Sequence, residues 1–220
     1  MELITIVIIA VTVLVSLKGF KDYAFFDRFK FQPLAITKGK QYDRLLTSGF
    51  LHVDMMHLFF NMLTLFFFAN IVIAFCARMF DGHVPTGSVI FAIIYILSII
   101  GGNLLSLFFQ RGNSHYSAVG ASGGVSGIVF AAIVIAPTAL KIYGVVRGWL
   151  FSILYLGYSV YGMQKQLGNI GHEAHLGGAI VGMVAPLILA PELFQINMIY
   201  ILGMLIPLAV LLVLAFKSRR

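Results

Sequence analysis

Seven apolar runs of roughly membrane-crossing length constrain the fold of this chain more than any other feature of its sequence. A helix needs about 20 mostly apolar residues to cross the hydrocarbon core of a bilayer. Arg147 interrupts the fifth run, so we expect the helix of that run to start nearer Trp149. The runs cover approximately residues 3–17, 55–77, 89–109, 119–140, 142–163, 174–190 and 196–216.

Too few charged residues are present to cover a soluble domain. Hydrophobic residues make up 60% of the 220 residues, and charged residues make up only 10%. A soluble domain keeps roughly a quarter of its residues charged, because they form its wetted surface. We therefore predict an all-α polytopic membrane protein with one integral domain. Glu2 is the only charge before the first run, which favours a retained span over a cleaved signal peptide.

Charge and cysteine content narrow the classes of partner. The formal net charge is +7, but the basic residues are scattered through loops and tail and are not clustered with aromatic residues. This pattern favours contact with anionic headgroups of the lipid bilayer, and it does not indicate nucleic acid. Cys76 is the single cysteine, so no disulfide within the chain is expected, and its apolar surroundings predict a small buried side chain.

The basic residues are distributed unequally between the two sides of the predicted bundle. One side comprises the long segment 18–54, the loops 110–117 and 164–171, and the C-terminal tail, and it carries 12 of the 15 Lys and Arg residues. Cytoplasmic loops are enriched in Lys and Arg. The charge distribution alone therefore predicts that this side faces the cytoplasm.

Polar residues at the start of the second run form the first candidate cluster. His57 and Asn61 are four residues apart and share one face of a helix, and His52 precedes them at the lipid–water boundary. Polar and ionisable residues inside a span mark a functional site by default. The alternative is that this pair only joins helices through hydrogen bonds.

The second cluster is the stretch VGASGGVSG at residues 119–127. It matches the G-x-S-x-G pattern of a nucleophile elbow, but that elbow requires a strand before a helix, and no parallel sheet is expected here. Ser122 and Ser126 are enclosed by glycines, which allow two helix backbones to approach closely. The alternative is that both serines are merely further small residues at such a crossing. The glycines are Gly120, Gly123, Gly124 and Gly127.

The third cluster is GHEAHLGGAIVGM at residues 171–183. Its two histidines are one residue too close for the zinc motif H-E-x-x-H, so we do not predict a metal site. His175 precedes Gly178 and Gly182 by three and seven residues, which places it on or near a glycine-lined helix face. Such a face is able to press against another glycine-rich helix.

Together the clusters predict a serine–histidine pair across two packed helices. His175 would act as general base to Ser122, an otherwise weak nucleophile. His57 and Asn61 would donate hydrogen bonds to the oxyanion of an acyl-transfer intermediate. Hydrolysis needs water, and irregular backbone at residues 112–120 is tolerated at membrane depth if it lines a wet cavity.

At these residues the sequence closely resembles the rhomboid family of intramembrane serine proteases. The matches are GASG at 120–123, the H-x4-H-x3-N array at 52–61, and AHxxGxxxG at 174–182, in the same order and spacing. Arg44 is similar to an arginine in the long loop of that family, although Asp43 stands where a tryptophan is usual. The resemblance covers the chain from about residue 40 to residue 182.

The resemblance implies roles for individual residues and for the fold. Ser122 would be the nucleophile, His175 the general base and later acid, and the Ser122 N–H, His57 and Asn61 the oxyanion hole. The fold would be a six-helix protease domain over residues 1–195, followed by one extra transmembrane helix and a basic tail over 196–220. No metal or cofactor is expected. Accessory or structural residues would be His52, Arg44, Gly120, Gly123, Ser126, Gly178 and Gly182.

The resemblance also implies a substrate class and a location. Substrates would be single-span membrane proteins cut in or near the span. The protein would be a multi-pass protein of the cell membrane with its active site opening toward the outer face, which is opposite to the prediction from charge. Two other functions are considered. A catalytically inactive relative that binds membrane clients usually lacks the serine or the histidine, and a transporter would show matched broken helices in two halves, of which the sequence has no sign.

One position departs from the family pattern. Many members carry an aromatic residue four positions after the serine, where it stacks on the histidine ring, whereas this chain has Ser126. We hypothesise that the Ser126 hydroxyl orients the His175 imidazole by a hydrogen bond instead.

Overall fold

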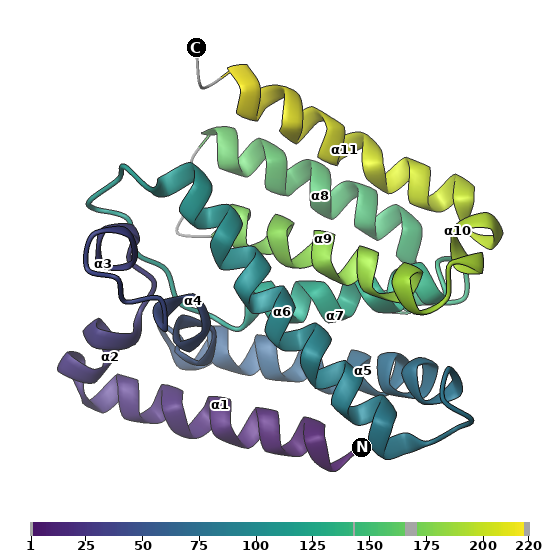
Figure 1. The fold of residues 1–220 in the computed structure, drawn as a ribbon, viewed down its shortest axis with the longest axis horizontal. Helices are drawn as coiled ribbons and strands as arrows, with labels where there is room; N and C mark the ends of the chain where they lie inside the picture. Colours follow the sequence, from purple (N-terminus) through teal and green to yellow (C-terminus); the bar gives the residue numbers. More distant parts are fainter. Residues whose placement is uncertain (1, 143, 166–170, 218–220) are drawn as a thin grey trace.

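The computed structural model describes residues 2–142, 144–165 and 171–217, and most of these are helical (Figure 1). The prediction of an all-α polytopic membrane fold is confirmed. Arg219 and Arg220 of the predicted basic tail, and residues 166–170 of the 164–171 loop, lie outside the described residues. The long helices are α1 (Leu3–Lys21), α5 (Met55–Arg78), α6 (Val84–Gln110), α7 (Ser122–Ile135), α8 (Gly148–Lys165), α9 (His172–Leu189) and α11 (Met198–Lys217).

Short elements connect the long helices. Two short antiparallel strands turn the chain from α7 into α8. In this hairpin, Lys141 pairs with Arg147 and Ile142 pairs with Val146. Charged Arg147 thus lies just before α8, as expected for a helix that starts near Trp149. The short elements are α2 (Tyr23–Phe29), α3 (Pro33–Thr37), α4 (Arg44–Thr47), η1 (Ser48–Phe50), α10 (Glu192–Ile196), β1 (Lys141–Ile142) and β2 (Val146–Arg147).

Four described helices, α1, α5, α6 and α9, are long and apolar enough to cross a bilayer. Helix α7 is shorter than the apolar run 119–140 that predicted it. It begins only after Gly120, whose φ is +138°, and it ends before Pro137, because a residue preceding proline is driven out of the helical region. Its 14 residues extend about 21 Å, which is less than the roughly 30 Å of a hydrocarbon core.

Helix α7 occupies the centre of the bundle. Every residue from 123 to 134 is buried, and α7 packs against α5, α6 and α9. Helix α6 crosses in front on a diagonal, with α1 on one side and α8 and α11 on the other (Figure 1). A helix buried on all faces can be apolar all round, which explains why the α7 sequence contains no charged residue.

Glycines set the distance between α7 and α9. A Cβ atom at Gly178 would overlap the carbonyl oxygen of Gly123, and a Cβ atom at Gly182 would overlap that of Gly127. Gly102 of α6 meets the other side of α9, where its Cβ would lie 2.5 Å from the carbonyl oxygen of Ala174. Helix α9 is therefore packed backbone to backbone against both neighbours.

Helix α11 forms an outer layer. It packs mainly on α8, with the rings of Trp149 and Tyr200 5.9 Å apart between centroids. Its start at Met198 fits the additional helix expected from residue 196 onward. The division into a 1–195 protease domain and a 196–220 extension remains a prediction.

We predict that Gly182→Ala destabilises the fold. The added methyl group has no space against the Gly127 carbonyl, and overpacking of this kind lowers the free energy of unfolding by about 1–3 kcal/mol. Thermal unfolding in detergent measures the effect. The control is Gly157→Ala on α8, where a Cβ meets nothing within 4 Å and where alanine gains about 1 kcal/mol of helix propensity. Equal melting temperatures for the two variants would contradict the prediction.

Candidate active site

Ser122 is the first residue of α7 and is half-buried. The turn before it is held by backbone hydrogen bonds from two directions. The Gly120 N–H donates to the carbonyl oxygen of Ser48 (3.0 Å), and Ala118 exchanges two backbone hydrogen bonds with Phe31. The first N–H groups of a helix have no acceptor within the helix, and they carry the positive end of its dipole. Ser122 thus lies where an anion is stabilised.

Gly120 brings the Ser122 hydroxyl and the His57 ring together. Its φ of +138° lies in the region that favours glycine. A Cβ atom at this position would be 2.7 Å from His57 Cε1, 3.0 Å from His57 Nε2 and 3.7 Å from Ser122 Oγ. No other residue is accommodated here, because both the backbone angle and the His57 ring exclude a side chain.

His175 lies one turn before Gly178 on α9, on the face that meets α7. A Cβ atom placed at Gly123 would lie 3.3 Å from the carbonyl oxygen of Ala174. This turn of α9 therefore borders the start of α7. Within the described residues no hydrogen bond joins Ser122 Oγ to the His175 ring. Such bonds are often long without substrate and tighten in the complex.

Tyr155 of α8 covers the His175 ring. The two rings are stacked, with centroids 5.9 Å apart and planes inclined by 23°. The Tyr155 hydroxyl and Ser126 Oγ are hydrogen-bonded at 2.8 Å. The hypothesis that Ser126 binds the His175 imidazole is therefore wrong, because its hydroxyl is directed to Tyr155. Sequence reasoning missed Tyr155, and the only signal was a group of tyrosines within the fifth apolar run.

His57 and Asn61 are adjacent on α5. Asn61 is 7% exposed, and one N–H of its amide donates to the His57 carbonyl oxygen at 2.9 Å. Asp54 caps the helix by accepting a hydrogen bond from the His57 N–H at 2.7 Å. Among the described residues, His57 Nδ1 is buried without a hydrogen-bond partner. The His57 ring lies beside Gly120, so it is close to the turn that carries Ser122.

His52 fixes the loop that precedes Ser122. Its Nε2 accepts a hydrogen bond from the Ala121 N–H (3.2 Å), so Nδ1 carries the proton and donates to Ser16 Oγ (2.9 Å). Ser16 in turn donates to the carbonyl oxygen of Phe50 (3.0 Å). His52 is fully buried, and burial, with His57 nearby, lowers its pKa to about 3. It holds the backbone of Ala121, next to Ser122, while it remains neutral.

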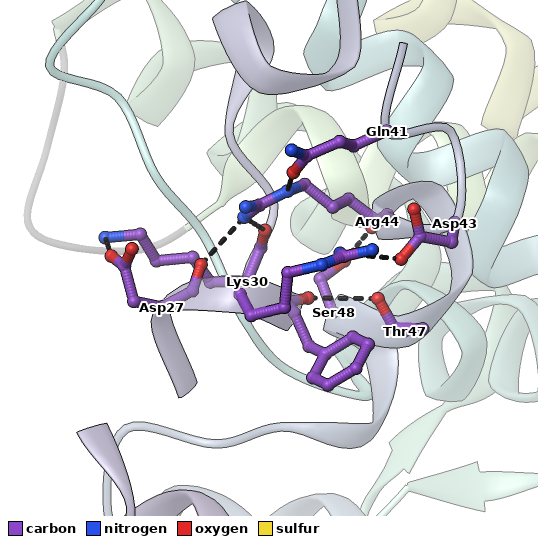
Figure 2. Close-up of polar contacts among 9 residues, drawn as sticks. Asp27, Lys30, Gln41, Asp43, Arg44, Thr47 and Ser48 are labelled. Atoms are coloured by element: carbon purple, nitrogen blue, oxygen red, sulfur yellow. Dashed lines mark hydrogen bonds and ion pairs between the residues drawn. The ribbon is translucent and has the colours of Figure 1, made fainter. Parts of the chain in front are cut away.

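Arg44 lies in α4, in the segment between α1 and α5 (Figure 2). Its Nε donates to Gln41 Oε1 (2.7 Å), and one Nη donates to the carbonyl oxygens of Asp27 and Lys30 (2.8 and 2.7 Å). Its own carbonyl accepts from the Ser48 hydroxyl (2.8 Å). Arg44 therefore closes the loop whose Ser48 carbonyl supports Gly120.

Glu173, the carboxylate next to His172, contacts the end of α6. It is buried and accepts a hydrogen bond from Gln110 Nε2 at 2.7 Å. In the part of the chain that the structure describes, no three His, Cys, Asp or Glu side chains are grouped so that they could hold a metal ion.

We predict that His52 makes the stability of the protein depend on pH. Below pH 6.5 the unfolded chain protonates this histidine, whereas the folded protein, with a pKa of about 3, does not. Stability therefore falls as the pH drops from 6.5 toward 3, by up to about 2 kcal/mol at pH 5. Thermal unfolding at pH 7.5 and 5 should show a smaller loss for His52→Gln than for the wild type, and equal losses would contradict the assignment.

Several known proteins are similar in sequence to this chain. A family profile described as the rhomboid domain matches residues 39–192. The chain is 30% identical to RHOMBOID-like protein 12, mitochondrial, of Arabidopsis thaliana, over 64% of this chain and 44% of that protein. It is 32% identical to Rhomboid protease GluP of Bacillus subtilis (strain 168), over 64% of this chain and 25% of that protein. The matched part is less than half the length of these relatives. Since the profile covers more than half of the chain, the protein belongs to the rhomboid family.

Proposed function

We propose that this integral membrane protein is an intramembrane serine endopeptidase that uses Ser122 as nucleophile and His175 as general base. The observation that supports this most is the convergence of three elements at the start of α7: the Ser122 hydroxyl, the His57 ring over Gly120, and the turn of α9 that carries His175. Membership of a family that includes Rhomboid protease GluP is consistent with this chemistry.

The first half of the reaction forms an acyl-enzyme. His175 takes the proton of the Ser122 hydroxyl while Ser122 Oγ forms a bond to the carbonyl carbon of the scissile peptide. The carbonyl π electrons move to the oxygen, which becomes an oxyanion. When the tetrahedral intermediate collapses, the C–N bond breaks, and protonated His175 gives its proton to the leaving amine.

The oxyanion is stabilised by donors that are already oriented. These are the Ser122 N–H at the positive end of α7, the ring of His57, and the second N–H of Asn61. Because the Asn61 amide is held by its bond to the His57 carbonyl, little reorganisation is needed as charge develops. Loss of one such donor in other acyl-transfer enzymes lowers kcat by about 10²–10³-fold.

The second half releases the enzyme. His175 accepts a proton from a water molecule, whose oxygen attacks the acyl carbon, and the new oxyanion occupies the same donors. Collapse breaks the bond to Ser122 Oγ, and His175 returns its proton to that oxygen. The products are a carboxylic acid and an amine, and the dyad is restored.

We further propose that the substrates are single-span membrane proteins, cut in or near the span. Exposed apolar residues on the outside of the bundle, including Phe59, Phe60 and Phe67 of α5, face the lipid from which such a span would approach. A peptide bond inside a helix is enclosed by its own turn, so a span must unwind locally before Ser122 reaches its carbonyl. Ease of unwinding would then contribute to substrate choice.

The proposed dyad of Ser122 and His175 can be tested by mutation. Detergent-purified protein should cleave a fluorogenic transmembrane peptide, and Ser122→Ala and His175→Ala should each lower kcat by at least about 10³-fold. Matched controls are Ser114→Ala and His115→Ala in the exposed loop before α7, which should cleave at the wild-type rate. Equal cleavage by the wild type and the Ser122 variant would refute the proposal. A folded wild type that binds the peptide without cutting it would favour the inactive, client-binding relative.

The second prediction concerns orientation. We propose that the protein lies in the cell membrane and that the side carrying the 18–54 segment and the end of α11 faces outward. The buried Arg44 network holds that segment by hydrogen bonds to backbone carbonyls, so its placement does not depend on its charge alone. Reporter domains inserted after Lys40 or fused at the C-terminus should be active only outside the cytoplasm. Activity of both reporters in the cytoplasm would support the prediction from charge instead.

A further inference from the structure

We propose that Tyr155 of α8 is a positioning residue for His175 and that Ser126 anchors it. This inference deepens the proposed function and rests on it, because His175 is assigned there as the general base. It is carried by two contacts of one side chain: the stacked ring of His175, 5.9 Å away between centroids, and the hydroxyl of Ser126 at 2.8 Å.

The stacked contact limits the rotation of the imidazole. A histidine ring turns about χ2 in a broad, soft well, so a general base needs neighbours that hold its plane. Tyr155 covers one face of the His175 ring, and His172 meets it edge to face, with centroids 6.5 Å apart and planes at 74°. These two neighbours leave the imidazole little freedom to swing away from α7.

The hydroxyl contact connects the stacked ring to the helix of the nucleophile. Ser126 lies one turn after Ser122 on α7, so the Tyr155 hydroxyl is tied to the same rigid helix that carries the reacting oxygen. Ser126 is buried, and a hydrogen bond in such surroundings is strong, because no water competes for it. A larger residue at position 126 would displace Tyr155.

Two aromatic side chains hold the Tyr155 ring in place. Phe130 of α7 and Phe151 of α8 each lie with ring centroids 5.6 Å from it. Aromatic pairs at this separation stabilise a defined ring orientation. The Tyr155 ring is therefore held by side chains of both α7 and α8. Because it stacks on His175 of α9, it also limits the orientation of that imidazole.

The kinetic test compares four variants with the same fluorogenic peptide. Tyr155→Leu removes both contacts and should lower kcat by about 10²-fold, because a small displacement of a catalytic group reduces the rate by that factor. Tyr155→Phe keeps the stack and should restore most activity, to within about fivefold of the wild type, the loss expected for one hydrogen bond. Ser126→Ala should match Tyr155→Phe, and combining the two should cost no more than either alone.

A matched control separates positioning from general stability. Tyr161→Leu changes the same residue type on the same helix, at a side chain that is 53% exposed, and it should leave kcat unchanged. For every variant KM should stay within about twofold of the wild type, since positioning acts on the transition state and not on substrate binding. A Tyr155→Leu variant that is folded, with wild-type kcat, would overturn the inference.

A second measurement does not depend on turnover. In protein labelled with 13C at histidine Cε1, the His175 resonance is identified by its loss in His175→Ala. The ring current of a stacked tyrosine shields the proton attached to His175 Cε1. The resonance of that proton should therefore move downfield in Tyr155→Leu and stay close to its original position in Tyr155→Phe. An unchanged resonance in Tyr155→Leu would refute the contact. If the wild type proves inactive, the proposed function fails, and this spectrum alone decides the inference.

Discussion

The contact on which the rest of the structure depends is the approach of α7 and α9 without side chains between them. Gly178 and Gly182 lie against the carbonyl oxygens of Gly123 and Gly127, so these two helices are as close as backbones allow. Between transmembrane helices the hydrophobic effect contributes little, and close packing supplies the attraction. The same proximity determines how far the imidazole of one helix is from the hydroxyl of the other.

Close to this contact, His52 is accommodated as a buried polar group without a charge. His52 uses both ring nitrogens in hydrogen bonds to neutral partners, and its neutral form is the one that fits. Arg44, a buried charged group, lies in the loop and donates hydrogen bonds to carbonyl oxygens. An uncompensated charge near the middle of the bundle would cost several kcal/mol, so a buried charged group needs hydrogen-bond partners.

Much of the architecture follows from the sequence, because composition and apolar runs are local properties. The glycine spacings after His175 predicted a close helix contact, and the structure contains one. Two features were not accessible in this way. The short length of α7 depends on the turn at Gly120 and on Pro137, and the partner of Ser126 depends on which face of α8 meets α7. The Gly120 turn and the Ser126 contact are properties of tertiary packing, whereas Pro137 is a local signal within the apolar run. The catalytic roles themselves remain predictions.

The outer position of α11 has a consequence for how such proteins are compared. Helix α8 makes its most extensive contacts with α11, and Trp149 and Tyr200 pair across that boundary. The rhomboid domain match ends at residue 192, before α11 begins. The helix that bears Tyr155 is therefore supported on one side by a segment that a domain alignment omits. A chimera that joins this core to a foreign C-terminal helix would change the packing of α8, and with it the support of the Tyr155 ring against His175, without altering a single aligned residue.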